Sequence, residues 1–61
     1  MKSAELIKLL KKNGWYEVAQ KGSHKQFKHE TKTGKITIPD HKGKDIAIGT
    51  LNAILKQAGL K

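Results

Sequence analysis

Residues 15–38 of the chain read WYEVAQKGSHKQFKHETKTGKITI, and this stretch decides the fold. Aromatic and β-branched residues at 15–20 favour a first strand. Residues 23–30 alternate around one apolar side chain, that of Phe27, which is typical of a second strand with one buried face. The segment 36–38 places two isoleucines on one face of a third, short strand. Because glycine-bearing turn sequences separate these segments, the sequence predicts three consecutive antiparallel strands.

Helical patterns flank the strands on both sides. Residues 3–13 carry leucine and isoleucine at helical spacing, with Ser3 as the expected N-cap, Glu5 in the first turn and Asn13-Gly14 as the left-handed stop. Residues 49–58 show the same apolar periodicity and are followed by a glycine. The predicted order is therefore helix, three strands, helix.

The predicted fold class is α+β, in αβββα order, with both helices packed on one face of a three-stranded antiparallel sheet. This arrangement buries the apolar face of every element and leaves the other sheet face open to water. Residues 1–61 are expected to form a single domain. A chain of 61 residues is too short to enclose a large substrate cavity, so any active site must lie on the surface.

The composition excludes several classes of protein. Without cysteine, the chain has neither a disulfide scaffold nor a zinc site built on thiolates. No apolar run approaches the roughly 20 residues needed to cross a bilayer, and the first residues lack the pattern of an export signal. We therefore expect a soluble cytoplasmic protein that does not use a membrane.

Lysine dominates the charge of the chain. The 13 basic residues are all lysines and oppose 5 acidic residues, which gives a formal net charge of +8. Seven of the lysines and all three histidines lie between residues 21 and 44, together with only Glu30 and Asp40. Such a concentration of positive charge favours binding to a phosphate backbone. Because lysine does not make the bidentate contacts with which arginine reads guanine, we expect little sequence selectivity.

Strand alternation predicts which side chains reach the open face of the sheet. If Phe27 points toward the helices, His29 shares its side. The side chains of the second strand expected on the open face are then His24, Gln26 and Lys28.

His24 is the candidate for proton transfer, because an imidazole can donate or accept a proton near neutral pH. RNA cleavage needs a base for the 2′-hydroxyl proton, an acid for the leaving 5′-oxygen, and cations to stabilise the phosphorane. The glycine at position 22 lets a nucleic acid backbone approach His24, and Lys21 and Lys28 supply positive charge. An exposed histidine with no chemical role is the alternative.

The other two histidines have different expected roles. We expect His29 to be a surface residue at the end of the hairpin. The predicted register brings the segment that ends at His41 across from His24. His41 is then a second proton-transfer group, an RNA contact, or a loop histidine bonded to the backbone.

The positions of the histidines do not favour a metal site. Strand alternation places His24 and His29 on opposite faces of the sheet, and no pair of histidines has the helical spacing of a zinc enzyme. The sequence therefore predicts neither a metal site nor a cofactor.

Trp15 and Tyr16 have rings able to stack on bases, but we expect both to cover the small core.

The chain also carries a set of motifs in a definite order: NGW at 13–15, QKGSH at 20–24, ITIPDH at 36–41, GTL at 49–51 and ILKQAGL at 54–60. In this order and spacing they resemble the HicA toxin family of bacterial and archaeal mRNA interferases. The resemblance covers nearly the whole chain. Lysine occupies basic positions that are often arginine in relatives, which weakens the case for specific base contacts but not for phosphate contacts.

The resemblance implies a fold similar to the double-stranded-RNA-binding domain and a metal-independent ribonuclease activity on mRNA. It also implies a cognate HicB antitoxin that binds the toxin and masks its catalytic histidine, which falls on His24. The residues expected to contact RNA are Lys21, Ser23, Gln26, Lys28, His41 and Lys42.

Two functions of other classes compete with the nuclease. A non-catalytic double-stranded RNA-binding module grips phosphates with lysines at the start of its last helix, whereas here no lysine precedes Lys56 in the predicted helix. The other alternative is a small interaction protein whose charge attracts an acidic partner. An inhibited toxin also needs such a partner, with acidic residues facing the lysines.

Overall fold

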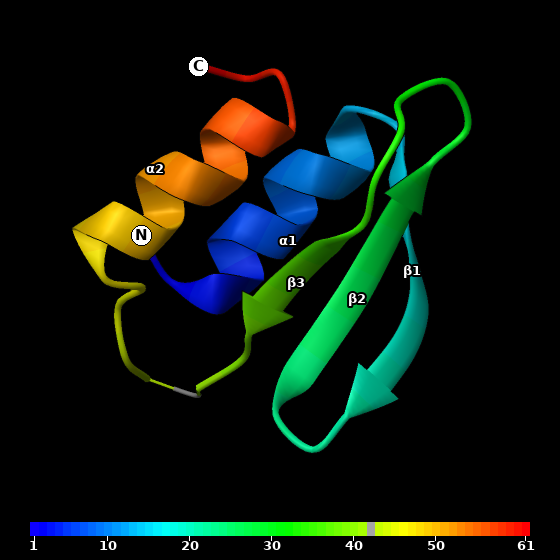
Figure 1. Ribbon diagram of the computed structural model, residues 1–61. Helices are drawn as coiled ribbons and strands as arrows, with labels where there is room; N and C mark the ends of the chain where they lie inside the picture. Colours follow the sequence, from blue (N-terminus) through cyan, green and yellow to red (C-terminus); the bar gives the residue numbers. More distant parts are fainter. Residues whose placement is uncertain (42) are drawn as a thin grey trace.

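The computed structural model describes residues 1–41 and 43–61 and shows the αβββα order that the sequence predicts (Figure 1). Its elements are α1 (Ser3–Lys12), β1 (Trp15–Lys21), β2 (His24–His29), β3 (Ile36–Pro39) and α2 (Ile48–Gln57). None of the helices in this part of the chain is long and apolar enough to span a membrane.

The strands form one antiparallel sheet in the order β1-β2-β3, so β2 is central. Phe27 on β2 lies opposite Glu17 on β1 and Ile36 on β3. Between Glu17 and Ala19 the register of β1 shifts by a bulge, which leaves Val18 without a partner in β2. Figure 1 shows both helices on the same side of this sheet, as predicted.

The core lies between the helices and the sheet. Phe27 is fully buried, together with Leu6 and Leu10 of α1 and Ile36 and Ile38 of β3. Each such side chain contributes about 1.5–3 kcal/mol by leaving water. Because Ile36 and Ile38 are both buried, the predicted alternation of β3 is confirmed.

The start of α1 differs from the prediction. Lys2, not Ser3, is the N-cap, and its backbone N–H donates a hydrogen bond to Glu5 Oε1 over 2.9 Å. Ser3 is the first helical residue and is buried, and its hydroxyl donates to the Pro39 carbonyl over 2.8 Å. The serine therefore ties α1 to the end of β3, a use of the hydroxyl that local capping rules do not consider.

The other helix boundaries shift by one residue. α1 ends at Lys12 rather than residue 13, with Asn13 as its C-cap, and α2 begins at Ile48 rather than residue 49 and ends at Gln57.

The expectation that both aromatic residues of β1 cover the core is confirmed for Trp15 and wrong for Tyr16. Trp15 is 2% exposed, whereas Tyr16 is 46% exposed. Adjacent residues of a strand point to opposite faces, so only one of the two rings can reach the helices.

The segment before α2 is held against the N-terminus. Ile46 N–H donates to the Met1 carbonyl over 2.9 Å, and Lys2 Nζ donates to the Gly43 carbonyl over 2.9 Å. Lys2 Nζ also lies 3.5 Å from a carboxylate oxygen of Asp45. These contacts fix the loop that follows β3 beside α1.

The turn after α1 gives a first test of the fold. Gly14 has φ +92°, and a Cβ added there would lie 2.6 Å from His29 Nε2. We expect Gly14→Ala to lower the free energy of unfolding by more than about 1 kcal/mol, because strain and a clash add.

Gly22→Ala is the matched control, because φ there is +55° and nothing lies within 4 Å of an added Cβ. Urea denaturation of both variants measures the difference. Equal losses of stability would contradict the close approach of His29 to Gly14.

Candidate active site

The face of the sheet opposite the helices, here called the open face, is assembled by cross-strand pairing. Side chains of paired residues lie on the same face of a sheet. With His24 and its alternate neighbours pointing away from the core, the open face consists of Tyr16, Ala19, Lys21, His24, Gln26, Lys28, Thr37 and Pro39. None of these residues is acidic. Phe27 is buried, whereas His24 and Lys28 are exposed, so the predicted alternation of side chains along β2 is confirmed.

His24 is the first residue of β2 and is exposed. The turn before it is fixed by two hydrogen bonds: Asp40 N–H donates to the Ser23 carbonyl over 2.6 Å, and Gln20 Nε2 donates to the Gly22 carbonyl over 3.0 Å. Within residues 1–41 and 43–61, no hydrogen bond or ion pair engages the His24 ring. The backbone at His24 is thus fixed, and both ring nitrogens are open to a ligand.

One lysine lies beside this imidazole. Lys21 lies directly across from His24 on β1, at a spacing of about 5 Å between Cβ atoms. The nearby carboxylate of Asp40 is paired with Lys25 Nζ at 3.2 Å. Lys25 is two residues before Phe27, so its side chain lies on the same face as that of Phe27. This ion pair therefore forms on the helix side of the sheet. The carboxylate of Asp40, which follows Pro39 of the open face, is therefore engaged by Lys25 and not by Lys21.

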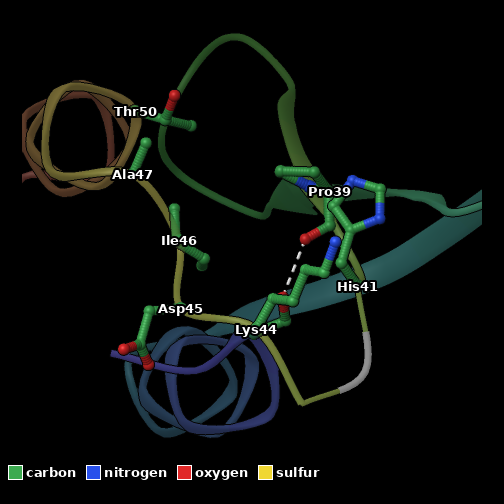
Figure 2. Close-up of a pocket in the computed structure, with 8 residues that line it drawn as sticks. Pro39, His41, Lys44, Asp45, Ile46, Ala47 and Thr50 are labelled. Atoms are coloured by element: carbon green, nitrogen blue, oxygen red, sulfur yellow. Dashed lines mark hydrogen bonds between the residues drawn. The ribbon is translucent and has the colours of Figure 1, made fainter.

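The loop after β3 brings His41 to the same end of the sheet as His24. Pro39 is opposite His24, which confirms the predicted register. His41 is exposed and lines a pocket of about 250 Å³ between this loop and the start of α2. In Figure 2 the Lys44 side chain extends toward Pro39 and His41, while Ala47 and Thr50 form the opposite wall. Sequence reasoning did not identify Lys44 as a site residue, because Lys44 reaches the pocket only as a result of the path that the loop after β3 takes.

The other expected RNA contacts are spread over the sheet. Ser23 is half-buried, and its carbonyl is engaged by Asp40. Gln26 is half-buried at the centre of the open face, and Lys28 is exposed near its far end. Lys28 lies four positions after His24, which is about 13 Å along the strand. Lys42 lies outside the described residues.

His29 has a structural role that the sequence did not reveal. We expected a surface residue, but His29 is half-buried, and its ring meets that of Trp15 edge-on at 5.2 Å between centroids. Its Nδ1 accepts from the backbone N–H of Thr31 over 3.1 Å and of Lys32 over 3.3 Å. Its Nε2 lies 3.0 Å from the Asn13 carbonyl, so the tautomer with the proton on Nε2 satisfies every contact.

In residues 1–41 and 43–61, no group of three or more His, Asp or Glu side chains is arranged to hold a metal ion.

Comparison with known families gives a match over nearly the whole chain. A family model described as the HicA toxin of bacterial toxin-antitoxin matches residues 3–60, nearly the entire chain. This match confirms the resemblance drawn from the motifs. A search of curated proteins returned no match.

The contrast between His24 and His29 predicts unequal effects on stability. His24→Ala removes an exposed ring that has no hydrogen-bond partner in the described residues, and it should change the free energy of unfolding by less than about 0.5 kcal/mol. His29→Ala removes hydrogen bonds to three backbone groups and should cost about 1–3 kcal/mol.

Equilibrium denaturation in urea measures both values. A loss of stability in His24→Ala as large as that in His29→Ala would mean that His24 also supports the fold.

Proposed function

Because the chain belongs to the HicA toxin family of toxin-antitoxin systems, we propose that it is an endoribonuclease that cleaves mRNA without a metal ion, with His24 as general acid or base. The single observation that carries this proposal is the position of His24. Its ring is exposed, engages no partner in the described residues, and lies opposite Lys21 on a face without acidic residues. A proton-transfer group needs such access to its substrate.

The reaction that suits this site is transfer of the phosphoryl group to the neighbouring 2′-hydroxyl. A base removes the 2′-hydroxyl proton, the 2′-oxygen forms a bond to phosphorus, and the bond to the 5′-oxygen breaks as an acid protonates it. The products are a 2′,3′-cyclic phosphate and a 5′-hydroxyl end. His24 performs one of the two proton transfers, and His41, at the same end of the sheet, is the candidate for the other.

The lysines provide electrostatic stabilisation. Charge accumulates on the non-bridging oxygens in the pentavalent transition state, and a fixed cation beside them lowers its energy. Lys21 faces His24 across the hairpin, which supports this role. Lys28 holds the RNA backbone farther along the same face.

A toxin of this type needs an antitoxin, and we propose a HicB-type protein that covers His24. Acidic side chains facing Lys21 and Lys28 would complement the charge of the open face. Because the proposed substrate is mRNA, the proposed site of action is the cytoplasm.

The proposed role of His24 predicts a loss of activity without a loss of structure. Expression of the wild-type chain should arrest growth and degrade mRNA, whereas His24→Ala should do neither. Purified wild-type protein should leave 2′,3′-cyclic phosphate ends on an RNA substrate. Circular dichroism of His24→Ala provides the folding control, and full RNA cleavage by this folded variant would contradict the mechanism.

The proposed phosphate contacts predict that removal of a lysine charge weakens RNA binding on the open face but not on the helices. Lys21→Gln and Lys28→Gln should each weaken binding to RNA and reduce the slope of log affinity against log salt by about 0.7. Lys8→Gln removes the same charge from α1, on the covered side of the sheet, and should leave the slope unchanged.

Affinity for an oligonucleotide with 2′-O-methyl groups at every position, which lacks the attacking hydroxyl, measures binding alone at several salt concentrations. Equal effects of Lys8→Gln and Lys28→Gln would contradict binding on the open face.

A further inference from the structure

An exposed aromatic ring lies on the lysine-bearing face of the sheet. Tyr16 is 46% exposed and pairs directly with Lys28. The ring does not serve the core, because Trp15 next to it fills the place beneath the helices. Val18, the unpaired residue of the bulge, is 44% exposed on the same strand. The edge strand β1 thus presents apolar surface beside positive charge.

We propose that Tyr16 stacks on an unpaired base of the RNA substrate, and that the substrate is therefore single-stranded where it crosses β1. This inference rests on the proposed function and extends it to the class of substrate. Proteins that bind single strands combine cations along the backbone with aromatic rings under the bases. Tyr16 and Lys28 provide one ring and one cation side by side on the open face.

The composition of the open face favours a nucleic acid over a protein as the occupant of this surface. Its apolar residues lie on the two edge strands, Tyr16 and Ala19 on β1 and Pro39 on β3, whereas its central strand carries only polar or basic side chains. A protein interface of ordinary size needs a broad apolar centre of well-packed side chains. An unpaired nucleotide needs only one flat apolar surface with a cation beside it.

The geometry also places the stacked base relative to the scissile bond. Tyr16 pairs with Lys28, and Lys28 is four residues from His24 on β2, or about 13 Å at the usual rise of a strand. The base on Tyr16 therefore belongs to a nucleotide near the cleaved linkage and not to the linkage itself. Bases in an RNA helix are already stacked and paired, so a duplex does not offer this contact.

The test compares the affinity of four proteins for a fully 2′-O-methylated oligonucleotide, single-stranded or annealed to its complement. The proteins are the wild type, Tyr16→Ala, Tyr16→Phe and Ile48→Ala. Ile48 is the matched control, because it is 75% exposed but lies at the start of α2 on the covered side of the sheet. Circular dichroism and urea denaturation verify that each variant is folded.

Tyr16→Ala should weaken binding to the single strand by about 5- to 150-fold, the range for loss of one base–aromatic stack. Tyr16→Phe and Ile48→Ala should bind like the wild type, since the first keeps the ring and the second leaves the open face intact. Affinity for the duplex should be the same for all four proteins.

Three results would overturn the inference. Unchanged single-strand affinity of Tyr16→Ala would show that the ring makes no contact with RNA. An equal loss for the duplex would show that the contact is not a base stack. Loss of binding to a co-expressed antitoxin, with RNA affinity intact, would assign Tyr16 to a protein interface.

Failure of the proposed function can be distinguished from failure of the stacking inference. If the wild type neither binds nor cleaves RNA, both proposals fall; if it cleaves RNA and Tyr16→Ala binds and cleaves as well, only the stacking inference falls.

Discussion

Burial of Phe27 is the constraint on which the remainder of the molecule depends. The ring lies at the centre of the middle strand, fully buried between the sheet and both helices, and pairs across to Ile36 on β3. Because side chains alternate along a strand, fixing Phe27 toward the helices sends its alternate neighbours to the other face. A shift of register by one residue would bury His24 and expose the core. The same hydrophobic burial that stabilises the fold therefore presents the candidate catalytic histidine to solvent.

Three of the five acidic residues are engaged away from the open face. Asp40 pairs with Lys25 at 3.2 Å, Asp45 lies 3.5 Å from Lys2, and a carboxylate oxygen of Glu5 caps α1. These carboxylates are used at the helices and at the loop after β3, away from the open face. Within the described residues no ion pair engages Lys21 or Lys28 of the open face, whereas Lys2 and Lys25 each lie beside a carboxylate. The open face therefore carries two lysines and no acidic side chain.

Local patterns predicted the element order, the outward direction of His24 and the pairing that sets Pro39 against it, because each follows from alternation around a single buried residue. They failed where a side chain acts over a long sequence separation. Ser3 bonds to a carbonyl 36 positions away, and the ring of His29 bonds to Asn13 across 16. Strand propensity also could not show that Tyr16 is exposed. Two adjacent aromatic residues favour a strand equally, whether one or both of them are buried.

The most direct test of the account is NMR chemical-shift mapping of the isotopically labelled protein with a single-stranded 2′-O-methyl oligonucleotide. The account predicts that the perturbed signals concentrate in β1 and β2, with the His24 ring among them, and that the exposed faces of α1 and α2 remain unperturbed. Perturbations concentrated on the helices, with the His24 ring unaffected, would contradict the claim that the uncovered face of the sheet is where RNA binds.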